Sequence, residues 1–267
     1  GYSSAASDVY KRQIYGIYFS PTHTSKKVVE AIVKGYEAGA WEEIDLTFPV
    51  QERERVIKEA LVIVGVPVYG GRVAETALER LGQIRGENAA VVSVVVYGNR
   101  DYEDALLELS DFMKERGFIS VAGAAFIGEH SYSRRGMPIA AGRPDTEDKA
   151  EALAFGKKVK KKLERLVSLE EAGELKIPGH FPYKEKGTKT LIAPITREEL
   201  CIRCGICAKV CPTAAIEGDI PRSLAERCIK CCACVKECPL EARVFDTPYT
   251  AMLFEKFSTR REPECWI

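Results

Sequence analysis

The sequence lacks a long hydrophobic run. No stretch of its 267 residues approaches the roughly 18 consecutive apolar residues that a membrane-spanning helix needs. The charged, apolar and small-residue progression of a signal peptide is missing as well. We therefore expect a soluble, cytoplasmic protein that has no membrane partner.

An excess of charge of one sign is also missing. Lys and Arg together number 39, as do Asp and Glu, so the field around the molecule has no dominant sign and offers no footprint for nucleic acid. No Gly-x-Gly-x-x-Gly motif follows an apolar run, which argues against a bound nicotinamide dinucleotide. The sequence thus disfavours both nucleic-acid binding and dinucleotide binding.

Residues 1–13, GYSSAASDVYKRQ, contain neither an initiating Met nor a hydrophobic period. They resemble translated sequencing-adapter read-through. We therefore expect a non-native or disordered tail that carries no function.

From Ile14 onward, short apolar runs alternate with amphipathic stretches, the pattern of βα units on a parallel sheet. Five runs are predicted to be strands: Ile14–Phe19, Trp41–Leu46, Ala60–Val68, Ala89–Tyr97 and Ile119–Ile127. The last three are apolar on both faces, as buried parallel strands are. Helical periodicity covers residues 24–39, 101–117 and 145–167. The sequence therefore predicts an α/β domain over residues 14–167.

The remaining chain changes composition twice. Residues 168–190 lose the helical period and collect Gly, Pro and Lys, which is typical of a linker. A cysteine-dense region follows over residues 191–247. Residues 248–267 form a C-terminal tail with room for one more helix.

The cysteines gather in one place. Nine of the ten lie between Cys201 and Cys238, and in a chain without an export signal this favours metal or cluster ligation over disulfides. CIRCGICAKVCP and CIKCCACVKECP are two copies of one unit, 27 positions apart, with Cys at relative positions 1, 4, 7 and 11 and then Pro. This is the spacing of bacterial two-cluster ferredoxins, in which the fourth Cys of each unit ligates the other cluster.

We therefore expect two 4Fe-4S clusters. The predicted ligands are Cys201, Cys204, Cys207 and Cys238 for one cluster, and Cys228, Cys231, Cys234 and Cys211 for the other. Zinc is the alternative, since paired CxxC steps also make sulfur cages, but zinc would leave the third Cys of each unit unused. Cys232 stands outside the register, at the position of Gly205, and we interpret it as a small filler with a free thiol.

Residues of about 195 to 246 resemble the clostridial-type ferredoxins, on the strength of the eight spaced cysteines with Pro212 and Pro239. The resemblance implies a small α+β domain that carries single electrons at low potential. It does not specify the redox partner.

The loop after the first predicted strand is rich in hydroxyls. It opens into a helix, whose start supplies unpaired amides and the positive end of a dipole. The loop resembles the phosphate loop of flavodoxins: Ser20, Thr22 and Ser25 match the pattern, Thr24 adds a hydroxyl, and His23 replaces the glycine. A positive φ at His23 would cost about 1 to 2 kcal/mol, against about 1.5 to 3 kcal/mol for each charge-assisted hydrogen bond. We expect a weakened phosphate site; an ordinary helix cap is the alternative.

Two further loops are expected to complete a flavin site. After the third strand come Pro67, Val68, Tyr69 and Gly70, where Tyr69 is predicted to lie along the flavin ring. After the fourth strand come Tyr97, Gly98, Asn99, Arg100 and Tyr102, which are predicted to present amides to the ring edge, with Tyr102 as a cover. Taken alone, each of these two loops is equally typical of an ordinary turn, which is the alternative interpretation. In the strand order 2-1-3-4-5 the three loops border one crevice, which favours FMN.

Residues 14–165 resemble the flavodoxin-like domains that are fused to ferredoxin modules in anaerobic bacteria and archaea. The resemblance implies a doubly wound five-stranded parallel sheet in the order 2-1-3-4-5, FMN, and electron transfer between FMN and the clusters. The loop from Gly128 to Asp145 is expected to cover the flavin or to receive the ferredoxin region. A flavin-dependent reductase of a small molecule and a cluster-only redox module without FMN are the alternatives. The redox partner and oligomeric state are left open.

Overall fold

The computed structural model describes residues 13–37, 39–49, 54–188 and 190–267. Of the predicted tail, only Gln13 is described, and it begins the first strand; the rest of the tail lies outside the described residues. No helix in the described ranges is both long and apolar enough to cross a membrane.

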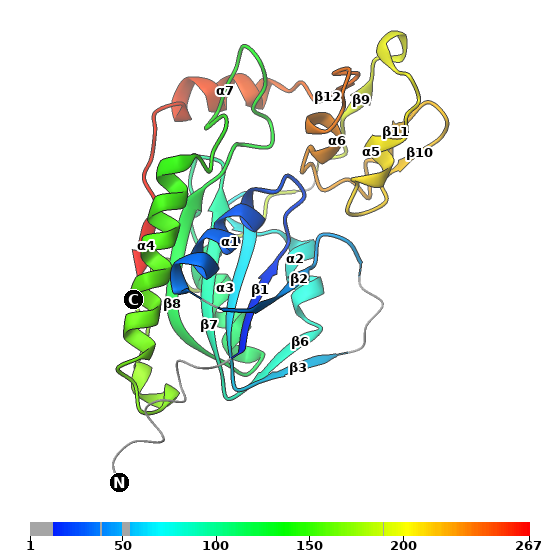
Figure 1. Cartoon of the computed structure of the whole chain (residues 1–267). Coiled ribbons are helices and arrows are strands. Elements are labelled where there is room, and N and C mark those ends of the chain that lie inside the picture. Colours follow the sequence, from blue (N-terminus) through cyan, green and yellow to red (C-terminus); the bar gives the residue numbers. More distant parts are fainter. Residues whose placement is uncertain (1–12, 38, 50–53, 189) are drawn as a thin grey trace.

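A parallel sheet forms the centre of the larger part of the chain (Figure 1). Its strands are β1 (Gln13–Tyr18), β2 (Trp41–Asp45), β4 (Ala60–Tyr69), β7 (Ala89–Tyr97) and β8 (Phe118–Ile127). They pair in the order β2-β1-β4-β7-β8, all parallel. This is the predicted order 2-1-3-4-5, and the flavodoxin-like fold is confirmed. β7 is buried along its whole length, because helices cover both faces of the sheet.

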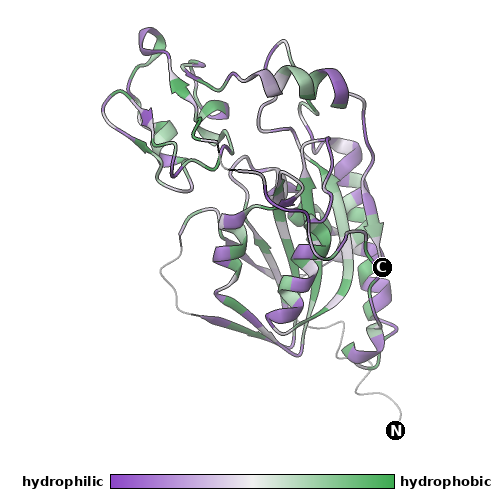
Figure 2. Ribbon diagram, turned by 180° about the vertical axis from the view of Figure 1, so that it is seen from behind, coloured by the Kyte–Doolittle hydropathy of each residue, from purple (hydrophilic) through white to green (hydrophobic). Residues whose placement is uncertain are grey.

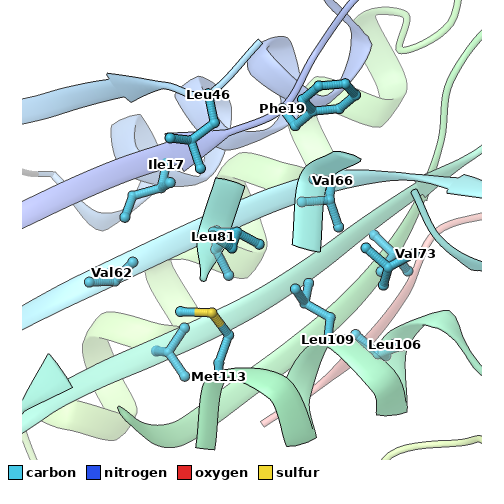
Figure 3. Packing of buried hydrophobic residues seen from close by; sticks show 14 of the residues in the cluster. Ile17, Phe19, Leu46, Val62, Val66, Val73, Leu81, Leu106, Leu109 and Met113 are labelled. Carbon is cyan, nitrogen blue, oxygen red and sulfur yellow. The ribbon is translucent and has the colours of Figure 1, made fainter. Parts of the chain in front are cut away.

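Helices α1 (Thr24–Tyr36) and α4 (Thr146–Leu163) cover one face, and α2 (Glu75–Leu81) and α3 (Ala105–Glu115) cover the other. Figure 3 shows the core on the second face, and Figure 2 shows that the central strands are hydrophobic whereas the outer helices carry hydrophilic residues. α1 and α4 approach closely at two glycines. A Cβ on Gly35 would lie 2.0 Å from the Leu153 carbonyl oxygen, and one on Gly156 would lie 2.1 Å from that of Ile32.

Short elements extend this frame in ways that the apolar pattern did not predict. β3 (Arg55–Lys58) and β6 (Ile84–Glu87) form a separate parallel pair. β5 (Arg72–Val73) pairs with β4, and β13 (Glu264–Trp266) pairs antiparallel with β8, which brings the main sheet to seven strands. The C-terminal segment thus supplies α7 (Pro248–Phe257), the expected helix, and also an edge strand of the sheet.

The segment predicted as a linker is held against α3. After η1 (Leu169–Ala172), the Asp104 carboxylate accepts the amide hydrogens of His180 at 2.9 Å and Lys184 at 2.7 Å. The Tyr183 hydroxyl donates to Asp111 at 2.8 Å. The chain therefore reaches the cysteine region along a fixed path.

The cysteine region, residues 191–247, is built from short elements. They are β9 (Ile195–Thr196), η2 (Glu198–Leu200), α5 (Ile206–Lys209), β10 (Ile216–Glu217), β11 (Arg222–Ser223), α6 (Ala233–Lys236) and β12 (Arg243–Val244). β9 pairs with β12 and β10 with β11, both antiparallel. The region lies beyond the carboxyl ends of the parallel strands (Figure 1), where ligands of such sheets bind.

Candidate functional site

The two cysteine units repeat each other in backbone as well as in sequence. Arg203 and Lys230, 27 positions apart, both have a φ of 58°. Gly205 and Cys232, again 27 apart, have φ values of 74° and 58° and begin α5 and α6. Cys232 therefore occupies a left-handed position that favours glycine.

The fourth cysteine of each unit accepts a backbone hydrogen bond in the same way. The Ala215 amide donates to Cys211 Sγ at 3.2 Å, and the Ala242 amide donates to Cys238 Sγ at 3.2 Å. Such N–H donors stabilise a thiolate. Both units thus offer an equivalent site for a sulfur ligand.

The cysteines line two cavities. The outer cavity is lined by Cys201, Cys204, Cys207 and Cys238. The inner cavity is lined by Cys211, Cys228, Cys231 and Cys234, and also by Cys232. In the described part of the chain, no group of three or more His, Cys, Asp or Glu side chains is placed to hold a single metal ion. Each cavity brings together three cysteines of one unit and the fourth of the other, which are the sets that the spacing predicts.

The two cavities differ in their exposure. The outer cavity is bordered by exposed Cys204 and by Ile202, whose side chain is 65% exposed. In the inner cavity, burial raises the pKa of Cys231 to about 12 and that of Cys234 to about 11. Ile229, on the wall of the inner cavity, packs against the core of the sheet. The inner cavity therefore faces the flavodoxin-like part, and the outer cavity faces solvent.

Arg80, on α2, ties the cysteine region to the sheet. Its buried guanidinium donates to the carbonyl oxygens of Leu46 at 2.7 Å and Pro212 at 2.6 Å. Pro212 directly follows Cys211, which lines the inner cavity. This contact could not be predicted from the sequence, because Arg80 and Pro212 are 132 residues apart.

The loop from Gly128 to Asp145 receives the cysteine region, one of the two roles expected for it. Lys236 Nζ lies 2.5 Å from Glu129 Oε1 and 3.1 Å from the Ser133 carbonyl oxygen. The Tyr132 and Phe245 rings meet edge to face with centroids 5.1 Å apart. Charged and aromatic contacts therefore both fix this interface.

The loop between β1 and α1 has the shape of an anion site. His23 stands directly before α1 with a φ of 63° and a ψ of 2°, and its side chain makes no capping hydrogen bond. Ser20 Oγ accepts the amide hydrogen of Lys26, in the first turn of α1, at 3.0 Å, whereas Ser25 Oγ is buried without a hydrogen-bond partner. Thr22 and Thr24 are half-buried beside them. A helix start that holds one hydroxyl on a first-turn amide and a second, spare hydroxyl fits a phosphate.

The His23 side chain turns toward the cysteine region. Its Nε2 atom lies 3.6 Å from Glu237 Oε1, and 59% of the side chain is exposed. A carboxylate at this distance competes with a phosphate for the imidazole. The left-handed strain anticipated from the sequence is present, and the imidazole is directed at protein.

Tyr69 ends β4 beside the inner cavity. Burial raises the pKa of its hydroxyl well above the usual value, and the nearby thiols of Cys231, Cys232 and Cys228 raise it further. Gly70, at a φ of 65°, turns the chain back after it. Pro67 and Val68 are half-buried in the same strand. The second predicted flavin loop therefore adjoins the second cysteine unit.

The third loop is engaged by the C-terminal segment. Asn99 Nδ2 donates to the carbonyl oxygens of Phe257 at 2.6 Å and Thr259 at 2.7 Å. The Tyr102 ring lies between Tyr97 and Trp266. Tyr102 was predicted to cover a flavin ring; in the structure its ring and the Asn99 side chain contact protein.

Two other residues shape the third loop. The Arg100 guanidinium pairs with Glu103 at 2.8 Å. The His130 ring packs on Gly98, where a Cβ would lie 2.3 Å from its Cδ2 atom. Gly98 is thus required by the close approach of His130.

Arg243, on β12, is a site residue that the sequence reading missed. It is 2% exposed, lines the outer cavity and donates to Cys234 Sγ at 3.8 Å. Its charge opposes the rise in pKa that burial causes at Cys207, Cys228 and Cys234. The repeat could have revealed it. Arg243 is the counterpart of Ile216, 27 positions earlier, so a charged residue replaces an apolar one at an equivalent position.

A 4Fe-4S binding domain matches residues 194–217. The matched segment contains the whole first cysteine unit, from Cys201 to Cys211. The chain therefore joins a flavodoxin-like sheet to a 4Fe-4S binding domain, and this combination supports a redox role. A search of curated proteins found no match.

Solved structures resemble the flavodoxin-like part. An archaeal flavodoxin is 17% identical and covers 57% of this chain and 99% of its own, with a TM-score of 0.38. The rubredoxin:oxygen oxidoreductase of Desulfovibrio gigas is 13% identical over 57% of this chain and 36% of its own, with a TM-score of 0.42. A Fusobacterium nucleatum flavodoxin variant bound to flavin mononucleotide is 17% identical over 57% of this chain and 96% of its own, with a TM-score of 0.38.

Proposed function

We propose that the chain is an electron-transfer protein of the clostridial ferredoxin type joined to a flavodoxin. It holds one 4Fe-4S cluster in the outer cavity, a second in the inner cavity, and FMN at the carboxyl edge of the sheet. The observation that carries the proposal is that the cysteines lining each cavity come from both units and include the four ligands expected for one cluster. When bound, the clusters supply one-electron steps, and FMN couples these to two-electron steps.

The protein gives the two cavities different roles. Exposed Cys204 and Ile202 border the outer cavity, so this is the surface that a partner protein reaches. The inner cavity is lined by residues of the cysteine region alone, and its cysteines lie near Tyr69 at the end of β4. Electrons exchanged with a partner at the outer cavity would therefore pass through the inner cavity before they reach the flavin.

The chain's own groups would hold FMN at two loops. The start of α1, with the hydroxyls of Ser20 and Ser25, would bind the phosphate. Tyr69 and the backbone of residues 98–100 would border the ring. Because Tyr69 adjoins the inner cavity, a ring in this crevice would lie close to the inner cluster.

Anaerobic purification followed by measurement of iron, acid-labile sulfide and flavin on one sample tests the proposal. We expect about eight irons per chain, four for each cluster, and one FMN. Cys232→Ala is the matched control, because it removes a thiol beside a predicted ligand and should keep about eight irons, whereas Cys231→Ala should lose the inner cluster.

Two results would overturn the assignment. Half of the expected iron in the unaltered protein would exclude the second cluster. Absence of bound flavin under saturating added FMN would exclude the crevice at the three loops.

A further inference from the structure

A buried cation lies between the two cavities. Arg243 is a wall residue of the outer cavity, and its Nη2 atom donates to Sγ of Cys234, a wall residue of the inner cavity, at 3.8 Å. The side chain is 2% exposed. One side chain therefore borders the outer cavity and contacts a cysteine of the inner cavity.

The guanidinium is fixed by neutral groups. It donates to Thr196 Oγ1 at 2.7 Å, Ser223 Oγ at 2.5 Å, the Pro194 carbonyl oxygen at 3.1 Å and the Pro221 carbonyl oxygen at 3.0 Å. Among the residues that the structure describes, no carboxylate pairs with it. A buried charge normally has a counter-charge, because desolvation of an isolated ion is costly. The fold therefore holds the Arg243 guanidinium in place. The negative charge that balances it would come from cysteine thiolates and from clusters bound in the two cavities.

One donor of this side chain is still free. Arg243 Nε is buried and has no hydrogen-bond partner. Since Arg243 lines the outer cavity, a sulfur atom in that cavity is an available acceptor. The geometry thus gives one N–H group to Cys234 and leaves a second, at Nε, without a partner.

We propose that Arg243 is the shared counter-cation of the two clusters and raises the reduction potential of both. This rests on the proposed function, since it requires a cluster in each cavity. Each cluster gains one electron on reduction, with no bond formed or broken and no proton taken up. The added negative charge is stabilised by a cation that is shielded from water. The effect is larger at the inner cluster, whose ligand Cys234 accepts the direct hydrogen bond.

Anaerobic redox titration with dithionite, followed by electron paramagnetic resonance, tests the proposal on the full chain. In Arg243→Gln we expect both potentials to fall, with at least a tenfold shift of the one-electron equilibrium at the inner cluster, about 59 mV. Arg203→Gln is the matched control. Arg203 lies between Cys201 and Cys204 but is exposed and paired with Asp219 at 2.8 Å, so water screens its charge and its removal should change both potentials much less.

Iron and sulfide counts on every sample separate the possible failures. Missing clusters in the unaltered protein would refute the proposed function itself. Full iron in Arg243→Gln with potential shifts no larger than those of Arg203→Gln would refute the role of Arg243. If Arg243→Gln loses iron, Arg243→Lys keeps the charge and should keep the clusters with a lowered inner potential. A tenfold or larger shift of the one-electron equilibrium toward lower potential at both clusters of Arg243→Lys, or loss of iron from both variants while the fold is retained, would refute the role of the charge.

Discussion

At the scale of single residues, His23 shows how one backbone angle strains the loop between β1 and α1. Its φ of 63° is a conformation that costs a residue with a Cβ about 1 to 2 kcal/mol. The sequence suggested a positive φ at His23, because His23 replaces the glycine of the phosphate-loop pattern. The sequence could not fix the angle, because it depends on how the turn joins β1 to α1.

Replacing His23 by glycine should stabilise the fold. The left-handed strain is present in the folded chain itself, so its cost falls on folding and not on flavin binding. We expect His23→Gly to raise the free energy of unfolding by about 1 kcal/mol, because glycine holds the left-handed turn without strain. Urea unfolding measures the change. His23→Ala retains the Cβ and should show no gain; an equal gain in both variants would contradict the strain.

His130 is a half-buried histidine that the fold keeps neutral. Its Nδ1 atom accepts the Tyr132 amide hydrogen at 3.0 Å. Burial, and after it the charges of Lys236 and Arg100, lower the pKa of the imidazole from 6.5 to about 4.

This lowered pKa predicts a loss of stability in acid. Below pH 6.5 the unfolded chain binds a proton at His130 that the folded chain binds only near pH 4, so stability falls as the pH falls through this window. We expect the free energy of unfolding to drop by about 2 kcal/mol from this group between pH 7 and pH 5. Urea unfolding of the unaltered chain and of His130→Gln measures the difference. An equal pH dependence in both would disprove the assignment.

At the scale of elements, long apolar runs were predictable and short ones were not. β4, β7 and β8 can be predicted from the sequence, because a strand that is buried on both faces requires an unbroken apolar stretch. β13 has only three residues, Glu-Cys-Trp, and becomes a strand because β8 offers an open edge. α3 begins at Ala105, later than the predicted start at 101, because Asp104 stands at its N-terminal boundary. Pairing with distant segments decides such details.

The contact between Asn99 and the C-terminal segment should be measurable. Asn99 has a φ of 66°, so Asn99→Gly removes the two side-chain hydrogen bonds without backbone strain. We expect a loss of about 1 to 3 kcal/mol of unfolding free energy, because the carbonyl oxygens of Phe257 and Thr259 lose their donor. Thermal or urea unfolding measures it. Unchanged stability would show that water replaces the amide.

At the scale of the whole molecule, the grouping of the cysteines around two cavities agrees with their spacing, whereas the assignment of a cluster to each cavity stays a prediction. The docking of the cysteine region was not predictable. Arg80 reaches Pro212 and Lys236 reaches Glu129 only after the sheet and the cysteine region have both formed. The same holds for Arg243, whose role depends on two cavities lying side by side.

The Lys236–Glu129 pair should control how firmly the cysteine region stays on the sheet. We expect Lys236→Glu to keep its iron and flavin but to transfer electrons to the flavin more slowly. Like charges would face each other across the interface, and about 1 kcal/mol would raise the undocked fraction roughly fivefold. Stopped-flow measurement of flavin reduction gives the rate. The exchange Glu129→Lys with Lys236→Glu should restore part of it; no rescue would argue for another cause.

The edge strand β13 gives the cysteine region a second attachment. The chain enters this region from the segment fixed on α3 and afterwards returns through α7 to pair with β8. A domain tethered at both ends to one scaffold cannot swing away as a domain on a single hinge can. Exchange between the clusters and the flavin should therefore be a first-order event with a fixed span, independent of protein concentration.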